Sequence, residues 1–188
     1  MTQDRPDFFR RPNGPKASLP FEAAEYEVRL SGLRAIMERR GLDAVLLSSM
    51  HNIGYYSGFL YCSFGRAYGC VVTADACTTV SANIDGGQPW RRSVADNVIY
   101  TDWRRDNFWR AVADLVPEAA RLGIEGDHLT LAGREALGAH LPRAEPVDIA
   151  GDCMAARMVK SPAEIALIRE GARIADIGGA AVRDAIRP

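Results

Sequence analysis

The sequence predicts an α/β protein in which helices flank a mixed β-sheet. Short apolar or β-branched runs alternate with amphipathic segments, a pattern typical of strands joined by helices. Two of the runs are separated only by Ala74-Asp75-Ala76, which indicates a hairpin and therefore an antiparallel pair. With 188 residues, 47% hydrophobic and 25% charged, the chain is long enough and apolar enough to form a packed core.

The first expected helix covers residues 22–40, because its apolar residues recur at intervals of four, three and four. Gly41 follows two arginines and is expected to end this helix in the left-handed conformation. The run 43–48 then predicts a buried strand. The other expected elements are a weak helical segment at 50–59, strands at 68–73, 77–82 and 97–101, a helix at 108–116, a strand at 121–125, a helix at 130–141 and a strand at 146–149.

The two ends of the chain differ from its middle. Residues 1–17 are rich in Arg, Pro and Gly and lack an apolar stretch, so we expect a flexible arm, loose or lying along the surface, rather than a secretory signal. Ser161-Pro-Ala-Glu164 predicts a helix start with a capping box. The helix that follows is apolar on most sides, so we expect it to be the first helix of a second, truncated domain. The alternative is a terminal helix that packs against the first domain or a partner chain. The expected organisation is an arm at 1–17, an α/β domain at 18–160 and this helix at 161–188.

Composition and motifs exclude several classes of function. The net charge of −1 gives no basic surface for nucleic acid or an anionic membrane, and no apolar run is long enough to span a bilayer. Gly86-Gly87 lacks the third glycine of a dinucleotide-binding turn, and no phosphate-binding loop is present. No cysteine or histidine has the spacing of a metal site, so we expect neither metal nor cofactor, and a cytoplasmic protein with reduced thiols. The cysteines and histidines, all interpreted as structural, are Cys62, Cys70, Cys77, Cys153, His51, His128 and His140.

Two segments are too unusual to be read as plain scaffold. Residues 59–68 place four aromatic side chains around Arg66 in an expected loop. Arg66 can donate two N–H groups to a carboxylate, with Phe64 as an apolar wall beside it. An aromatic cluster that caps the sheet, with Arg66 stacked on a ring or in a surface ion pair, explains the same residues equally well.

The second segment type is the Trp-Arg-Arg triplet, which occurs at Trp90 and again thirteen residues later at Trp103. Trp and Arg are frequent at the energetic centres of interfaces. The preferred interpretation is that each tryptophan is a half-buried anchor with solvated arginines. An interface is the next interpretation, and nucleic-acid binding is a distant third.

The same segments resemble the N-terminal domain of the creatinase family, in the superfamily of pita-bread enzymes that includes prolidase and aminopeptidase P. The resemblance is carried by residues 51–66, 81–92, 100–107 and 173–181 and runs from about Phe21 to the end of the chain. It implies a homodimer of two-domain subunits that hydrolyses creatine to sarcosine and urea without a metal. It also implies that Phe64 and Arg66 reach the neighbouring subunit's active site and bind the creatine carboxylate.

The resemblance places the catalytic histidine and the carboxylates that hold the guanidinium beyond Pro188. No complete catalytic constellation is visible in the chain, so we expect the isolated fragment to be inactive. Two other interpretations remain open: a non-catalytic dimerisation or binding module, and the N-terminal domain of a prolidase-like metallopeptidase.

Overall fold

The computed structural model describes residues 5–61 and 65–186, and these residues contain one seven-stranded sheet in the order β1-β5-β4-β3-β2-β6-β7. Strand β2 pairs in parallel with β6 and in antiparallel with β3, which confirms the mixed sheet. The strands are β1 (Phe8–Arg10), β2 (Ala44–Leu47), β3 (Gly69–Thr73), β4 (Cys77–Ala82), β5 (Asp96–Tyr100), β6 (Arg121–Ile124) and β7 (Glu145–Asp148).

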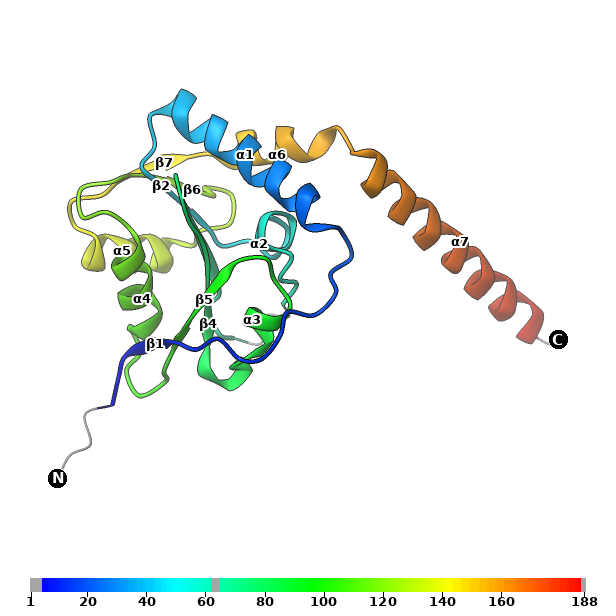
Figure 1. Cartoon of the computed structure of the whole chain (residues 1–188), viewed down its shortest axis with the longest axis horizontal. Helices are drawn as coiled ribbons and strands as arrows, with labels where there is room; N and C mark the ends of the chain where they lie inside the picture. The colour runs from blue at the N-terminus through cyan, green and yellow to red at the C-terminus, as the bar shows by residue number, and fades with distance from the viewer. Residues whose placement is uncertain (1–4, 62–64, 187–188) are drawn as a thin grey trace. The chain divides into compact units, whose positions relative to one another are not determined.

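Helices cover both faces of this sheet. Figure 1 shows α4 and α5 on one face and α1, α2 and α3 on the other, and the expected α/β fold class is confirmed. The helices are α1 (Ala23–Arg40), α2 (Met50–Ser57), the short 3-10 helix η1 (Asn83–Asp85), α3 (Gln88–Arg91), α4 (Asn107–Leu115), α5 (Leu131–His140), α6 (Ala150–Met158) and α7 (Pro162–Ala185).

One part of the core lies between α1 and the central strands, and another lies under α4, where Phe108, Ala111 and Val112 are buried. All four residues of β2 are buried, as the apolar run predicted. The predicted stripe of α1 is buried as well, with Leu33 completely shielded from solvent. Gly41 ends α1 at a φ of 61°, a left-handed conformation that is costly for any residue with a Cβ atom. The local signals of this part of the sequence therefore agree with the packing.

The direction of the strands brings distant segments to one edge of the sheet. Because β4 is parallel to β5 and antiparallel to β3, and β2 is antiparallel to β3 and parallel to β6, strands β2, β4, β5, β6 and β7 run the same way. Their carboxyl ends lie at the same edge as the amino end of β3. In α/β sheets, binding sites form in the crevice outside such carboxyl ends. We call this edge the carboxyl edge.

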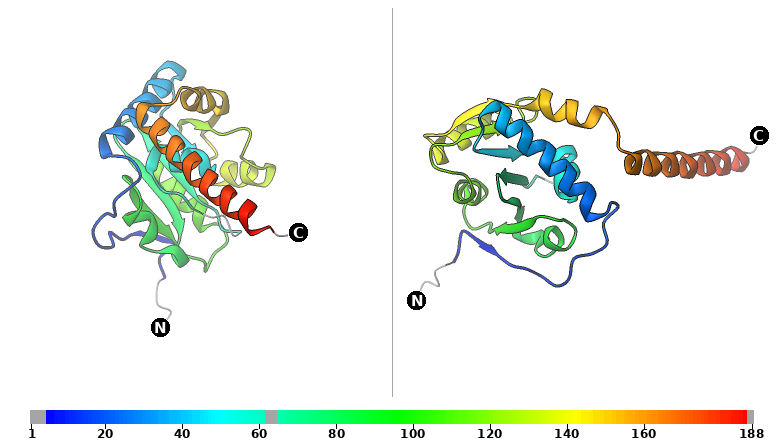
Figure 2. Two further views of the ribbon diagram at one scale, coloured as in Figure 1. Left: turned by 90° about the vertical axis from the view of Figure 1, so that its right-hand side faces the viewer. Right: turned by 45° about the horizontal axis from the view of Figure 1, so that its top comes forward.

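The described part of the N-terminal segment lies along the domain and adds a strand to the sheet. Residues 8–10 form β1, which pairs with β5 and lies at the end of the sheet. Figure 2 shows the chain from β1 passing alongside the region of α3 before it enters α1. The described part of the arm, residues 5–17, is therefore an ordered edge of the domain rather than a free tail.

The two Trp-Arg-Arg triplets hold this segment in place. Trp90 Nε1 donates to the carbonyl of Gly14 at 2.9 Å, and the Lys16 ammonium lies 3.7 Å from the centre of the Trp90 ring. Trp103 Nε1 donates to the carbonyl of Pro6 at 3.0 Å. The tryptophans are anchors, as preferred, and the chain that they anchor is the N-terminal segment.

The chain divides into two compact units, residues 1–153 and 154–188, and the division falls within α6. The second unit contains the end of α6 and α7. Helix α7 begins at the predicted capping box, in which the Ser161 hydroxyl accepts from the Glu164 amide and the Glu164 carboxylate accepts from the Ser161 amide. Its apolar side chains have no second layer within that unit to pack against.

Candidate functional site: the carboxyl edge of the sheet

The loop that carries Arg66 lies at the carboxyl edge, because it leads directly into the amino end of β3. The ends of β5 and β4 hold it. The Tyr100 hydroxyl, at the end of β5, donates to the carbonyl of Ala67 at 3.0 Å. The Tyr68 hydroxyl donates to the carboxylate of Asp85, which follows β4. Hydrogen bonds to two strand ends therefore fix the chain directly after Arg66, at Ala67 and Tyr68.

The Arg66 side chain points to solvent and is paired at one corner only. Its side chain is 43% exposed, and Nη1 donates to the carboxylate of Asp102, whose side chain is 39% exposed. Among residues 5–61 and 65–186, no protein group accepts from Nε or Nη2 of Arg66. These two donors form one of the edges with which arginine binds a carboxylate in a bidentate manner. Phe64 lies outside the described residues.

Three of the four aromatic side chains predicted around Arg66, those of Phe59, Tyr61 and Tyr68, form a cluster. The rings of Tyr61 and Tyr68 are 4.4 Å apart and nearly parallel, and Phe59 lies about 6 Å from both, at 6.1 and 6.3 Å. Arg66 itself is in a surface ion pair. The aromatic cluster and the ion pair are the features expected if these residues only cap the sheet. The Nε and Nη2 edge of the guanidinium is nevertheless unpaired within the described part of the chain, and carboxylate binding needs that edge.

A buried carboxylate that sequence reasoning did not single out lies beside this loop. Glu125 follows β6, is 1% exposed, and accepts from the Ser49 amide at 2.8 Å and from Asn52 Nδ2 at 2.6 Å. The Ser48 amide and the Ser49 hydroxyl also donate to it. Glu125 thereby joins the ends of β2 and β6 to the first turn of α2. The sequence offered only two signals for this network. They are an acidic residue at the end of one strand and Ser48-Ser49 at the end of another, and they lie up to 77 residues apart.

A cavity of about 180 Å³ opens between these groups. Its lining includes Ser48, Tyr61, Arg66, Trp109 and His128. Ser48 Oγ lies 3.1 Å from His128 Nδ1, and the Tyr61 hydroxyl donates to the carbonyl of Ser48 at 3.0 Å. The carboxyl edge therefore combines one cation, hydroxyl groups and an imidazole with an aromatic wall.

These groups do not form a hydrolytic triad. Glu125 contacts the serine side of the Ser48–His128 pair, and within the described ranges no carboxylate accepts from the His128 ring. The base of a triad needs such a partner to orient it. With Arg66 as its cation and hydroxyl groups beside it, the arrangement is suited to holding an anion.

Two tyrosines at this edge are kept in their neutral form. Burial, with a contribution from Glu125, raises the pKa of Tyr61 to about 12. Burial and the neighbouring Asp102 carboxylate raise the pKa of Tyr100 to about 12, against the opposing effect of Arg66. Both hydroxyls are therefore hydrogen-bond donors at neutral pH, which is the role in which the structure uses them.

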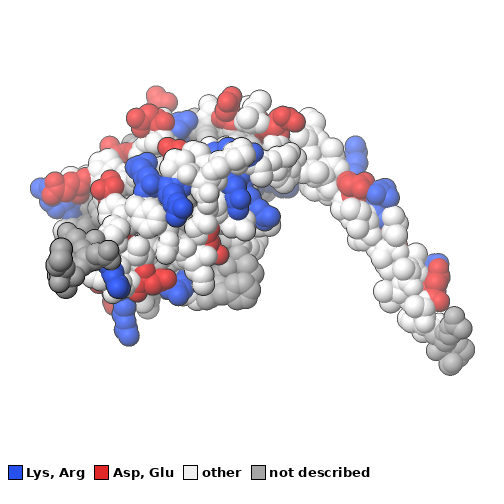
Figure 3. Space-filling view, turned by 60° about the horizontal axis from the view of Figure 1, so that its bottom comes forward, with Lys and Arg blue, Asp and Glu red and all other residues white. Residues whose placement is uncertain are grey.

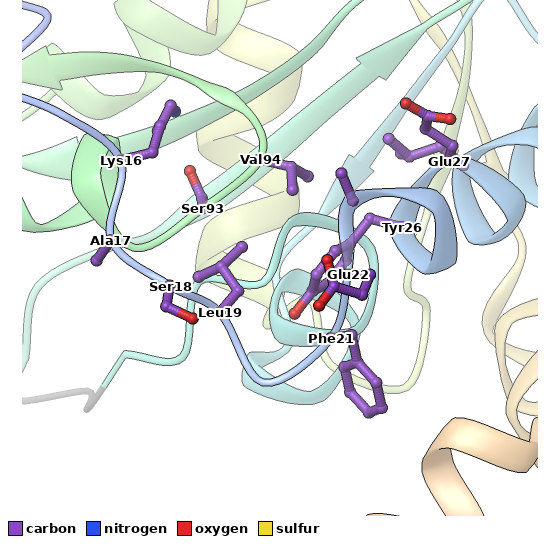
Figure 4. A pocket seen from close by; sticks show the side chains of 12 residues that line it. Lys16, Ala17, Ser18, Leu19, Phe21, Glu22, Tyr26, Glu27, Ser93 and Val94 are labelled. Atoms are coloured by element: carbon purple, nitrogen blue, oxygen red, sulfur yellow. The ribbon is translucent and has the colours of Figure 1, made fainter.

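A larger cavity, of about 510 Å³, lies away from the predicted site residues, between the N-terminal segment and α1. Figure 4 shows Leu19, Tyr26 and Val94 around it, with Lys16 at one end. Lys16 donates to the carbonyl of Ala95 at 2.7 Å, and burial lowers its pKa despite the nearby Asp96 carboxylate. Because Lys16 already has this partner and Trp90, we assign the cavity to the anchoring of the N-terminal segment.

In the part of the chain that the structure describes, no group of three His, Cys, Asp or Glu residues is placed to hold a metal ion. None of the described helices has the length and apolarity of a membrane span. Figure 3 shows basic and acidic side chains interspersed over the face that it presents. The cysteines Cys70, Cys77 and Cys153 are free thiols.

Comparison with known proteins agrees with this fold. The chain is 52% identical over 178 residues to a creatinase from Bacillus sp. (strain B-0618), covering 93% of this chain and 43% of the relative. Xaa-Pro dipeptidase from Bacillus anthracis has a TM-score of 0.70 at 24% identity, covering 87% of this chain and 44% of that one. A proline dipeptidase from Streptococcus pneumoniae TIGR4 has a TM-score of 0.63 at 20% identity, covering 70% of this chain and 98% of that one.

This chain thus spans less than half the length of the creatinase that it matches. The family model described as Creatinase/Prolidase N-terminal domain matches residues 29–159, which is more than half of the chain. The carboxyl edge with Arg66 lies within the matched range. The chain therefore belongs to the Creatinase/Prolidase N-terminal domain family.

Proposed function

We propose that this chain is the N-terminal part of a creatinase-like amidinohydrolase whose longer form hydrolyses creatine to sarcosine and urea. The observation that carries the proposal is the 52% identity to the Bacillus creatinase over 93% of the chain. The two dipeptidases described above share the fold at 24% and 20% identity. A likeness at this level does not indicate the same substrate. The level of identity is therefore what favours creatine over a peptide.

In this proposal the domain contributes a substrate contact and the rest of the protein contributes the chemistry. Arg66 binds the carboxylate of creatine held in the partner subunit's active site, and Phe64 packs beside it. The exposed Nε and Nη2 donors of Arg66 support this role, because a carboxylate can approach them without displacing Asp102. A histidine outside this chain acts as acid and base on the guanidinium carbon, so the 188-residue chain alone is inactive.

Two further features follow from the same proposal. The contact across subunits requires a homodimer, which light scattering of the longer protein measures. A cytoplasmic location is consistent with the free thiols of Cys70, Cys77 and Cys153. The reaction needs no metal ion.

The experiment that tests the substrate uses the longer protein that contains this chain. It is treated with a chelator and assayed with creatine for sarcosine and urea, and in parallel with Xaa-Pro dipeptides after addition of Mn²⁺ or Co²⁺. We expect urea from creatine with and without chelator and no dipeptide cleavage. Metal-dependent dipeptide cleavage with no urea would overturn the proposal.

The experiment that tests the site uses Arg66→Ala and Arg66→Lys in the longer protein. Hydrogen bonds to charged groups contribute about 1.5–3 kcal/mol, which predicts a roughly ten- to hundredfold rise in KM for Arg66→Ala. Arg66→Lys keeps the positive charge but loses the two-pronged hydrogen bond, so its KM should lie between those of wild type and Arg66→Ala. The matched control is Arg143→Ala, which removes an arginine that is also exposed and paired with a carboxylate, Glu118, at the opposite edge of the sheet. Equal KM values for wild type and Arg66→Ala would remove Arg66 from the site.

A second candidate function is a non-catalytic dimerisation or binding module of a prolidase-like metallopeptidase. The TM-score of 0.70 with the Xaa-Pro dipeptidase favours it at the level of fold. The substrate experiment above separates the two, because only this candidate predicts metal-dependent cleavage of a dipeptide.

A further inference from the structure

The partner of Arg66 belongs to a segment that the N-terminal part of the chain holds on both sides. Asp102 follows β5, and its neighbours Thr101 and Trp103 both hydrogen bond to the backbone of residues 6 and 7. The Thr101 amide donates to the carbonyl of Asp7 at 2.9 Å, and the Thr101 hydroxyl donates to the carbonyl of Pro6 at 2.8 Å. Trp103 Nε1 donates to the same Pro6 carbonyl at 3.0 Å.

Side chains reinforce the same junction. The Asp7 carboxylate lies 3.6 Å from a guanidinium nitrogen of Arg104 and 3.8 Å from one of Arg110. The Arg104 guanidinium stacks on the Trp103 ring at 4.3 Å. The second Trp-Arg-Arg triplet thus contributes both an indole donor and a cation to the attachment of the N-terminal segment.

A buried amide closes the turn from within. Asn107, at the start of α4, is fully buried and donates from Nδ2 to the carbonyl of Thr101 at 2.9 Å and to its hydroxyl oxygen at 3.0 Å. Asp102 therefore projects from a turn fixed by β5, by α4 and by the N-terminal segment. Its carboxylate is exposed, but its backbone is not free to move.

We infer that Asp102 is a positioning residue for Arg66, and that residues 6–10 serve the site by fixing the turn that carries Asp102. Asp102 accepts from Nη1 and so orients the guanidinium with its Nε and Nη2 edge directed away from the pair. This inference rests on the proposed function, because it matters to catalysis only if Arg66 binds a carboxylate.

A carboxylate beside Arg66 can either compete with the substrate or orient the guanidinium for it, and the geometry distinguishes these two effects. A carboxylate that occupied the whole guanidinium fork would compete with substrate, and its removal would lower KM. Asp102 contacts a single nitrogen, and no other group among the described residues accepts from Arg66. It therefore restricts the rotamers of Arg66 while leaving a bidentate edge open, and its removal should raise KM.

The kinetic test uses Asp102→Ala, Asp102→Glu and, as a matched control, Asp114→Ala in the longer protein. Asp114 is an exposed aspartate on α4 without a hydrogen bond to any described side chain. Exposed ion pairs are worth little, so we expect Asp102→Ala to raise KM about two- to fivefold, with kcat within about twofold of wild type. Asp102→Glu should raise KM by less than Asp102→Ala does. In the Arg66→Ala background, Asp102→Ala should have no further effect on KM.

A fall in KM for Asp102→Ala, or an equal rise in both backgrounds, would overturn the inference. If Arg66→Ala leaves KM unchanged, the proposed function fails instead, and the inference is then decided by a measurement that needs no substrate. That measurement is the order parameter of the Arg66 Nε–H bond, from ¹⁵N relaxation of the 188-residue chain.

In the relaxation experiment, Asp102→Ala should lower the Arg66 order parameter. Trp103→Phe removes the indole donor to Pro6 but keeps an aromatic ring beside Arg104 and the Thr101 hydroxyl bond to Pro6, so it should lower the order parameter by a smaller amount. Asp114→Ala should leave it unchanged. An Arg66 order parameter that is identical in wild type and Asp102→Ala would show that Asp102 does not position the guanidinium. An unchanged value for Trp103→Phe would remove the N-terminal segment from the proposal.

Discussion

Replacing Glu125 by alanine is expected to lower the free energy of unfolding of this chain by about 3 kcal/mol. The change leaves the amides of Ser48 and Ser49 without their acceptor, and it also removes the partner of Asn52, a buried side chain. Each donor left unsatisfied costs about 1–3 kcal/mol, and the two amides are only half-buried, so their costs lie near the lower limit.

Glutamine at the same position should cost much less, about 1 kcal/mol, because it keeps one carbonyl oxygen for the two backbone amides. Its new NH₂ group would face the Ser49 hydroxyl and the Asn52 amide. The hydroxyl can accept by rotating, and the amide can turn to present Oδ1, a buried atom with no hydrogen-bond partner among the described residues.

The assay is urea unfolding of the 188-residue chain followed by circular dichroism, with equal m-values required for the comparison. Glu135→Ala, at an exposed position of α5, is the control and should change stability by less than about 0.5 kcal/mol. If glutamine destabilised as much as alanine, the hydrogen bonds that Glu125 accepts could not be the source of the effect. If alanine were neutral, Glu125 would not hold β2, β6 and α2 together.

Three other predictions concern a turn, a thiol and a carboxylate. Gly58→Ala should lower the free energy of unfolding in urea by about 1–3 kcal/mol, because Gly58 ends α2 at a φ of +82° and a Cβ atom would lie 3.1 Å from Tyr26. The control is Gly54→Ala, which lies within α2 with room for a methyl group and should not lower the stability. The hydrogen bond with Cys77 and burial raise the pKa of the Cys70 thiol, so alkylation followed by mass spectrometry should label Cys77 before Cys70; the reverse order would contradict this. Hydrogen bonds from the Ala150 and Gly126 amides lower the pKa of Asp148 from its ordinary value of 3.8, so Asp148 stabilises the fold above pH 3.8 and this contribution is lost as the pH falls through the lowered value. Asp148→Asn should therefore weaken the dependence of stability on pH in this acidic range, and an unchanged acid limb would count against the interaction.

The elements that could be predicted are those whose signals are local. Helix α1 has a regular apolar stripe and a glycine at its end, and α7 has a complete capping box. The hairpin of β3 and β4 followed from two β-branched runs separated by three residues. In each case the residues that specify the element lie within or beside it.

The elements that could not be predicted depend on partners far along the chain. Strand β1 has only three residues in a stretch rich in Pro and Arg, and it is ordered by β5 and by Trp103, 97 residues from Pro6. Helix α3, of four residues, is too short to show a period. Local composition therefore indicated an arm where tertiary contacts form a sheet edge.

The candidate site divides in the same way. Arg66 was recognisable because it stands among aromatic residues in an expected loop. Its pairing with Asp102 joins residues 36 apart, and the network of Glu125 joins residues up to 77 apart. Sequence spacing does not reveal such pairs, because they arise when the strand directions bring separate loops to one edge.

The most direct test of the account is to measure how strongly Arg66 interacts with the substrate carboxylate itself. Inhibition or Michaelis constants are determined in the longer protein for creatine and for its neutral amide, each with wild type and Arg66→Ala. The account predicts that Arg66→Ala weakens creatine about ten- to hundredfold and the amide by less than about threefold. Equal weakening of both ligands, or of neither, would contradict the claim that this domain binds the carboxylate through Arg66.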